Sequence, residues 1–276
     1  MSQLLDQYRR LICALALLCF CADARALDPG RMMSQYVRER WDVDKGFSGG
    51  VVHAISQTKD GYLWIGTDDG LFRFDGFSFR RVSAFGPVLD LTTDGDGDLL
   101  VRLQGAVLLH KPDGQFENVD SGLGVTTSYV TAMYRESNGD VLISDLVTGI
   151  LRFQAMKFKV LVPQSELHGP PIVNSMAQAS PGKLWMGTLG AGLLYLTDGR
   201  IRAAPVQIPE RKVNCLLSGD DQQLWIGTDE GLFRWDGAKL TLVELPYQLE
   251  HVQILALLRD HNSNVWAGNR TRTLSD

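Results

Sequence analysis

Apolar and polar residues alternate in short runs along most of this chain, a pattern typical of β-strands rather than helices. The clearest segment is residues 59–76, KDGYLWIGTDDGLFRFDG, in which strand-like runs are separated by Asp-Gly pairs. Glycine adopts a positive φ without a steric penalty, so each Asp-Gly pair predicts a tight hairpin turn. We therefore predict a four-stranded antiparallel meander from the runs at 51–57, 62–67, 71–75 and 77–82.

The same pattern returns further along the chain, at residues 180–199 and 220–237. Tryptophans mark the register of the copies, and Leu100 and Leu142 fill the same column in two weaker copies. Successive members of the column lie about 40 residues apart, a period typical of β-propellers built from four-stranded blades. The predicted fold is an all-β propeller with about six units, near residues 51–82, 88–119, 130–161, 173–204, 213–243 and 254–276.

Residues 36–43 alternate in strand fashion ahead of the first unit, so we expect an orphan closing strand there. Together with three strands of the sixth unit, it would close a ring of six blades. The alternative is a seven-bladed ring that is truncated and open. The repeat pattern is lost after Trp266, and this loss favours the truncated ring.

A Trp-x-Gly pair recurs in the four best copies, and we predict that it forms the packing core of the repeat. The indole buries a large area and its N–H can find a backbone acceptor, while the glycine lets the next blade approach closely. Stacking of a cofactor on the indoles is the alternative, but recurrence in every good copy favours a core role. The pairs are Trp64 and Gly66, Trp185 and Gly187, Trp225 and Gly227, and Trp266 and Gly268.

Residues 1–26 have the pattern of an export signal. Arg9 and Arg10 precede an apolar run at 11–22, and Ala24-Arg25-Ala26 fits a cleavage site. The run is too short to span a bilayer as a helix. We expect cleavage after Ala26, a linker at 27–35, and export to the periplasm. A lipoprotein and an uncleaved anchor remain as alternatives.

Three of the four cysteines fall inside this predicted signal, so the exported chain keeps Cys215 alone. One thiol cannot form an internal disulfide, and the run VNCLLS around it predicts a buried residue on an inner strand. The formal net charge of −5 and the absence of basic clusters argue against a nucleic-acid partner.

Residues 51–76, together with the W-x(4)-G-F motif from Trp41 to Phe47, resemble the two-component regulator propeller family. The resemblance extends over nearly all of the exported chain, strongly in units one, four and five. It departs at residues 46–50, where the family has a GLP-type loop. The resemblance implies the periplasmic sensor region of a bacterial histidine kinase, hybrid kinase or diguanylate cyclase. It also implies seven blades, followed by a β-sandwich, a membrane helix and an output domain that this sequence does not contain.

Three motifs suggest chemistry, and each has a plainer interpretation. Residues 46–50 match G-x-S-x-G, but a nucleophile elbow needs a preceding strand and a following helix. Residues 94–98 alternate carboxylates as a calcium loop does, but the twelfth position is Gly105 instead of a glutamate. The five histidines show no metal-ligand spacing. We therefore expect no catalytic residue, metal or cofactor.

The predicted topology gathers the longer connections on one face, where propellers usually bind ligands. Solvation of the rim is the alternative role for any one of their residues. The weak candidate ligand-binding residues on this face are Ser48, Asp68, Tyr129, His168, Arg211, Asp229 and His251.

We expect a non-catalytic sensor of an unknown small molecule, with a saccharide as one candidate. Its partner would be a downstream signalling module or a partner chain, and dimerisation is compatible with this role. A propeller enzyme, either a hydrolase or a lyase, and a protein-docking scaffold are the alternatives.

Overall fold

The computed structural model describes residues 39–83, 85–119, 127–167, 172–219, 222–245, 252–260 and 263–269. Two short 3₁₀ turns, η2 (Val43–Lys45) and η3 (Gln164–Glu166), are the helical elements among these residues. Within the described part of the chain, no helix is long and apolar enough to cross a membrane. The chain divides into two units, and the larger, residues 40–260 and 265–276, contains every described strand.

The first three sheets each contain four antiparallel strands in chain order. The first consists of β1 (Val52–Gln57), β2 (Leu63–Thr67), β3 (Gly70–Phe74) and β4 (Phe79–Ser83). The second consists of β5 (Val88–Thr93), β6 (Leu99–Leu103), β7 (Ala106–His110) and β8 (Phe116–Asn118). The third consists of β9 (Val130–Arg135), β10 (Val141–Asp145), β11 (Gly149–Gln154) and β12 (Lys157–Pro163).

The next two sheets repeat this plan, and the sixth has two strands among the described residues. The fourth consists of β13 (Val173–Ser180), β14 (Lys183–Thr188), β15 (Leu193–Thr197) and β16 (Arg200–Ala203). The fifth consists of β17 (Val213–Ser218), β18 (Leu224–Thr228), β19 (Gly231–Trp235) and β20 (Leu240–Leu242). The sixth consists of β21 (Ile254–Arg259) and β22 (Val265–Asn269).

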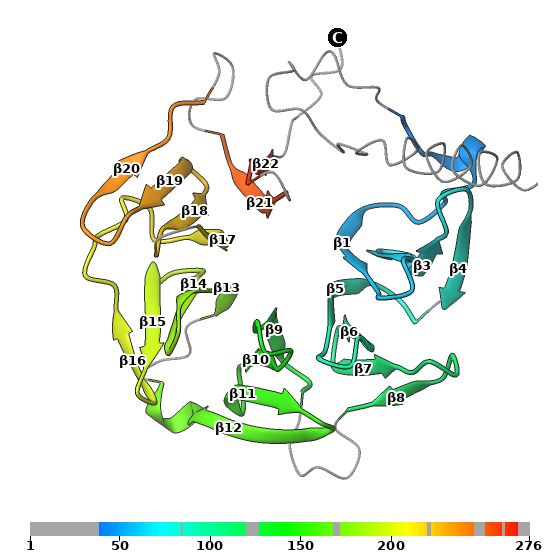
Figure 1. The fold of residues 1–276 in the computed structure, drawn as a ribbon, viewed down its shortest axis with the longest axis horizontal. Coiled ribbons are helices and arrows are strands. Elements are labelled where there is room, and N and C mark those ends of the chain that lie inside the picture. Colours follow the sequence, from blue (N-terminus) through cyan, green and yellow to red (C-terminus); the bar gives the residue numbers. More distant parts are fainter. Residues whose placement is uncertain are drawn as a thin grey trace, which may run out of the picture. The chain divides into compact units, whose positions relative to one another are not determined.

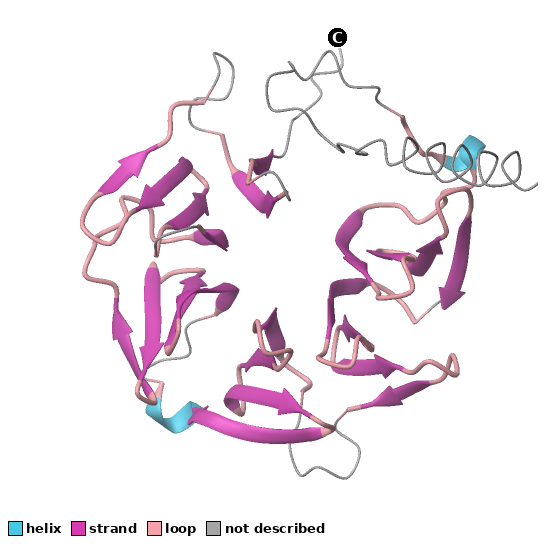
Figure 2. Ribbon diagram, viewed as in Figure 1, coloured by secondary structure: helices cyan, strands magenta, loops and turns pink. Residues whose placement is uncertain are grey.

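The sheets of the larger unit follow one another around a common axis, with the first strand of each sheet innermost (Figure 1). Strands and short loops make up nearly all of this unit (Figure 2). Each sheet is therefore a blade, and the predicted all-β propeller is confirmed. The Asp-Gly turns behave as expected, because Gly61, Gly70 and Gly76 all have positive φ.

Neighbouring blades are joined by a repeated contact between a glycine and a β-branched residue. A Cβ on Gly66 would lie 2.6 Å from Val88 Cγ1, and one on Gly227 would lie 2.8 Å from Ile254 Cγ2. Val88 and Ile254 each begin the inner strand of the next blade, and both are buried. Gly187 is overlaid in the same way by Val213. We call this the glycine contact: the missing side chain provides the space that the next blade fills.

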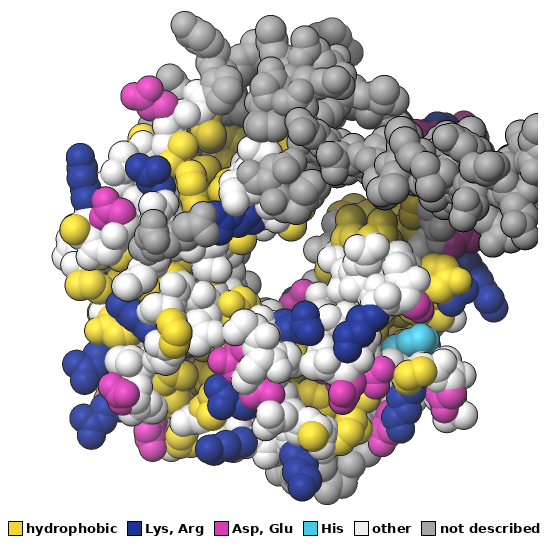
Figure 3. Space-filling model, in the orientation of Figure 1, with side chains coloured by type: hydrophobic (Ala, Val, Ile, Leu, Met, Phe, Trp, Pro, Cys, Tyr) yellow, Lys and Arg dark blue, Asp and Glu magenta, His cyan; other side chains and the backbone are white. Residues whose placement is uncertain are grey.

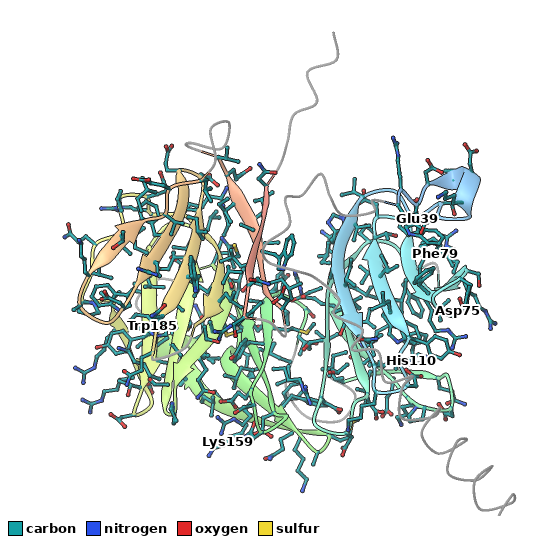
Figure 4. All side chains as sticks on the ribbon, turned by 45° about the horizontal axis from the view of Figure 1, so that its top comes forward. Glu39, Asp75, Phe79, His110, Lys159 and Trp185 are labelled. Carbon is teal, nitrogen blue, oxygen red and sulfur yellow. The ribbon has the colours of Figure 1, made fainter. Side chains whose placement is uncertain are left out.

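Two tryptophans of the column, Trp64 and Trp185, lie inside their blades, whereas Trp225 and Trp266 are half-buried. Trp64 and Trp185 are each 3% exposed, and Figure 4 shows Trp185 among the strands of the fourth blade. The indole N–H groups of Trp64 and Trp266 donate to Thr58 Oγ1 and Asp260 Oδ2, both at 2.9 Å. The expected backbone acceptor is therefore wrong for these two. In both blades the acceptor belongs to the residue six positions earlier, close to the turn between the first two strands.

The second blade carries Arg102 where the better copies have the column glycine. Its guanidinium donates to the carbonyl oxygens of Leu89, at 3.3 Å, and of Val130 on the third blade, at 3.2 Å. Asp90 lies beside it, with Oδ2 3.8 Å from Nε. Burial raises the pKa of Asp90, although the charge of Arg102 opposes this shift. A hydrogen-bonded cation thus replaces the glycine contact between these two blades.

The expected closing strand at 36–43 is not formed by the part of it that the structure describes, residues 39–43. Trp41 packs edge-on against Phe74 and Phe79 of the first blade, with ring centroids 5.1 and 5.2 Å away. The chain then turns through η2 and leaves it at Gly46, whose φ is +86°. This anchored turn replaces the strand there. Residues 36–38, the signal at 1–26, the linker at 27–35 and the expected strand at 270–274 lie outside the described residues.

We expect the substitution Gly66→Ala to destabilise the protein, because its Cβ would overlap Val88 at the blade junction. Overpacking of this kind costs about 1–3 kcal/mol of unfolding free energy. Urea denaturation should measure it. Gly190→Ala is the matched control, since no atom lies within 4 Å of a Cβ there, and it should change stability by less than about 0.5 kcal/mol. Equal effects of the two substitutions would contradict the glycine contact.

Cys215 should be nearly inert in the folded protein. It is buried, and desolvation raises the pKa of its thiol to about 12, so the reactive thiolate is scarce at pH 8. We expect iodoacetamide to label this residue about a hundredfold or more slowly in the native state than in urea. Peptide-resolved mass spectrometry would follow Cys215 alone. Comparable rates in the two states would show that the site is open.

Candidate ligand-binding face

The strand order gives the propeller two different faces. The first strand of each blade begins, and the second ends, at the face that also carries the connections between blades. We call it the crossover face. The opposite face, here the hairpin face, carries the turns between the first and second strands and between the third and fourth. Figure 3 shows acidic and basic side chains interspersed over the face in view, without a basic cluster.

Buried threonines fix the turns of the crossover face. Thr67, Thr188 and Thr228 donate from Oγ1 to the carbonyl oxygens of Gly70, Gly192 and Gly231, at 2.9, 2.8 and 3.0 Å. In the third blade, Asp145 takes the same position and accepts main-chain N–H groups from both sides of its turn. The residue that follows each threonine is therefore held in a defined place, and in two blades it is an aspartate, Asp68 or Asp229.

Asp229 is the centre of a polar cluster between the fifth and sixth blades. Lys212 Nζ, Asn214 Nδ2 and Gln253 Nε2 donate to its carboxylate at 2.9, 2.8 and 2.6 Å. Desolvation opposes ionisation of this carboxyl, but the three hydrogen bonds outweigh it and hold its pKa below the usual value. Asn214 also donates to the carbonyl oxygen of Ile254 at 3.1 Å, so the cluster links the two blades.

Asp68 forms a second, simpler polar group with His53, whose Nε2 lies 2.6 Å from Asp68 Oδ1. Both side chains are partly exposed. A carboxylate on one ring nitrogen orients an imidazole, which suits either ligand binding or proton transfer. The sequence analysis missed His53. Alignment of the repeats could have identified it, because His53 and Asn214 occupy the same position, the second residue of an inner strand. Each of them pairs with the aspartate that follows the threonine of its own blade.

The remaining candidates are more scattered. Ser48 is exposed on the loop before β1, and Tyr129 is 59% exposed before β9. Arg211 is exposed on the connection between the fourth and fifth blades. His168 and His251 lie outside the described residues. No contact between two of the predicted candidates is present in the described part of the chain. The structure instead pairs Asp68 and Asp229 with residues that the sequence analysis did not select.

The hairpin face carries a pocket of about 390 Å³ between the first and second blades. Its lining includes Asp96, Asp98 and Arg73, with His110 at the end of β7 (Figure 4). Desolvation and the neighbouring aspartates raise the pKa of Asp98, while burial and Arg73 lower the pKa of His110.

The calcium-like run at 94–98 forms a plain hairpin turn beside this pocket. Asp94 Oδ1 accepts the main-chain N–H groups of Asp96, Gly97 and Asp98, at 3.0, 2.9 and 2.9 Å. Lys59 Nζ donates to the carbonyl oxygens of Gly95 and Asp96 from the first blade. Among the residues that the structure describes, no group of three or more His, Cys, Asp or Glu side chains is placed to hold a metal ion.

Residues 46–69 match the family model described as "Two component regulator propeller", which confirms the resemblance recognised in the sequence. This match covers the loop before β1, the strands β1 and β2, and the start of the turn that bears Asp68. No curated protein matches the chain in sequence.

Solved structures share the fold at low sequence identity. The extracellular domain of a putative hybrid two component system from B. thetaiotaomicron has a TM-score of 0.69 at 21% identity; the match covers 84% of this chain and 34% of that one. Virginiamycin B lyase from Staphylococcus aureus, solved with quinupristin, has a TM-score of 0.64 at 15% identity, with 78% and 76% covered. PorZ, a surface component of the type-IX secretion system of Porphyromonas gingivalis, has a TM-score of 0.58 at 16% identity. That match covers 81% of this chain and 39% of PorZ. The chain thus spans about a third of the two component domain that it matches.

We expect the substitution Asp229→Asn to lower stability at pH 7 by about 1 kcal/mol, because a partly exposed carboxylate would lose its charge-assisted hydrogen bonds. The pKa of Asp229 is depressed on folding, so its contribution is present above the unfolded-state pKa and is lost as the pH falls through the lower folded value. Urea denaturation between pH 7 and pH 3 should therefore show the variant and the wild type converging in acid. A constant difference across this range would contradict the assignment.

Proposed function

We propose that this chain, whose residues 46–69 match the two component regulator propeller, is the extracytoplasmic ligand-sensing domain of a two-component or related signalling protein and catalyses no reaction itself. The family match carries the proposal. The likeness to an extracellular domain of a hybrid two component system supports the fold that such sensors use. Export follows from the predicted signal at 1–26 and from this likeness, so we propose a periplasmic location.

The crossover face is the proposed sensing surface. Its frame is fixed by buried threonines in the first, fourth and fifth blades, by Asp145 in the third and by the glycine contacts, while its polar side chains differ from blade to blade. Asp68 with His53, and Asp229 with its three donors, present carboxylate, imidazole, amide and ammonium groups within two small areas. Such groups suit the hydroxyls of a saccharide, each of which both donates and accepts. A saccharide is therefore our first candidate ligand.

Signal output would come from a change at the junction between blades. The Asp229 cluster joins the fifth and sixth blades, so a ligand that competes for its hydrogen bonds would alter how the sixth blade is held. We propose that a downstream signalling module or a partner chain, in a monomer or a dimer, responds to this change.

A thermal-shift screen of the whole protein against neutral and acidic oligosaccharides would test the proposal. A ligand present at 100 times its dissociation constant stabilises the folded state by about 2.7 kcal/mol, so a hit should raise the melting temperature by several degrees. The double substitution Asp68→Asn and Asp229→Asn should remove the shift, whereas Asp75→Asn, at a turn on the hairpin face, should keep it. Failure of every saccharide at millimolar concentration would refute saccharide sensing.

An enzyme is the second candidate, because His53 and Asp68 form an oriented carboxylate–imidazole pair and a lyase shares the fold. A panel of chromogenic esters and glycosides would decide the matter. Turnover that His53→Ala abolishes, and that Asp75→Asn leaves intact, would replace the sensor proposal. The third candidate is a docking scaffold for another protein. Negative results in both the thermal-shift screen and the turnover assay would favour it.

A further inference from the structure

A pocket of about 800 Å³ lies on the crossover face between the fourth blade and its connection to the fifth. This volume is within the range of small-molecule sites. It is separate from the Asp68 and Asp229 groups, none of whose residues line it. Its lining consists of Gly190, Ala191, Gly192, Leu193, Ala203, Ala204, Val206, Gln207, Ile208, Pro209 and Arg211.

The main chain of the turn from Thr188 to Gly192 forms the floor of the pocket, and hydrogen bonds hold this turn in place. The turn from Thr188 to Gly192 is one residue longer than the corresponding turns that follow Thr67 and Thr228. Thr188 Oγ1 accepts the N–H of Ala191 at 2.9 Å, and Gly192 N–H donates to the carbonyl oxygen of Arg211 at 2.9 Å. A Cβ on Gly190 or Gly192 would meet no atom within 4 Å. The turn is therefore rigid, yet no side chain fills the space above it.

The walls combine hydrocarbon side chains with exposed polar groups, and they carry one charge. Leu193, Val206, Ile208 and Pro209 provide hydrocarbon surface, and Gln207 adds an amide. Arg211 is the charged residue of the lining, and no carboxylate in the described part of the chain pairs with its guanidinium. The neighbouring Glu210 is used locally, because its Oε1 accepts the main-chain N–H groups of Arg211 and Lys212. The pocket thus places hydrocarbon side chains and polar groups beside a cation for which the described residues provide no carboxylate partner.

We propose that this pocket binds an organic carboxylate with an apolar body. The guanidinium of Arg211 would take the carboxylate in a two-point hydrogen-bonded pair, as arginine does with planar anions, and the hydrocarbon part would lie between Ile208 and the Gly190–Gly192 turn. This inference rests on the proposed sensing function and names a second ligand class for it. The backbone floor would recognise shape, since it offers close approach without side-chain obstruction.

Isothermal titration of the whole protein with phenylacetate, octanoate and neutral phenylacetamide would test the proposal. We expect at least one carboxylate to bind, and phenylacetamide to bind about tenfold more weakly or worse than phenylacetate. Arg211→Gln should weaken carboxylate binding by a similar factor. Gly190→Leu should block it by filling the pocket, at a position where an added Cβ meets no atom within 4 Å. Arg202→Gln removes an exposed arginine of the same blade outside the pocket and should change nothing.

Equal binding of the amide and the carboxylate, or equal effects of Arg211→Gln and Arg202→Gln, would overturn the proposal. So would the absence of binding by both carboxylates at millimolar concentration. A saccharide that stabilises the wild type and the Arg211→Gln variant alike, with no carboxylate binding, would refute this pocket while leaving the sensing function in place. If saccharides also fail, both proposals are refuted.

Discussion

After the first, fourth and fifth blades, the architecture of this chain depends on a close approach to the next blade that only glycine permits. Where Val88 or Ile254 begins an inner strand, the preceding blade presents Gly66 or Gly227 and leaves room for the branched side chain. The contact is small, but it is repeated at the same height in successive blades and sets the distance between them. The distance between neighbouring blades also sets how far apart their polar groups lie at the crossover face. It therefore determines which of these groups can form hydrogen bonds with one another.

Two blades carry another residue at the glycine position, Arg102 in the second and Ser144 in the third, and the Arg102 junction shows what the repeat can tolerate. Between the second and third blades, Arg102 occupies the glycine position and uses its fork to hold the carbonyl oxygen of Val130. A buried cation needs several acceptors to offset its lost hydration, and two carbonyl oxygens and Asp90 supply them. At this junction, hydrogen bonds from Arg102 replace the close packing of the glycine contact, and the two blades remain adjacent.

Sequence periodicity predicted the fold because tight turns and the tryptophan column are local features. Asp60-Gly61 and Asp75-Gly76 encode their hairpins without reference to the rest of the chain. In the second and third blades, where Arg102 and Ser144 replace the column glycine, Leu100 and Leu142 at the expected spacing located the repeat. The strand expected at 36–43 failed over its described part because alternation cannot reveal that Trp41 packs against Phe74 and Phe79.

The candidate site was less predictable for a physical reason. Asp229 was selected, but its donors Lys212 and Asn214 come from the start of the neighbouring strand β17, and Gln253 comes from the segment before the sixth blade. His53 lies on a strand with ordinary alternation of polar and apolar residues. Only its alignment with Asn214 in the repeat indicates that it belongs to the candidate site. Chemistry that depends on distances between blades needs the structure, whereas chemistry within one turn does not.

Among the described residues, the first and the sixth blades each lack one of the contacts between blades that their neighbours make. Val52 begins β1 and is 42% exposed, although its counterparts in the other blades are buried under a neighbour. At the other end, a Cβ on Gly268 would meet only Ala256 of its own blade among the described residues. Cooperativity in such a linear series of contacts falls toward its ends. Fraying of β21 and β22 should therefore precede melting of the middle blades, and any surface that caps them would raise the cooperativity of the whole series.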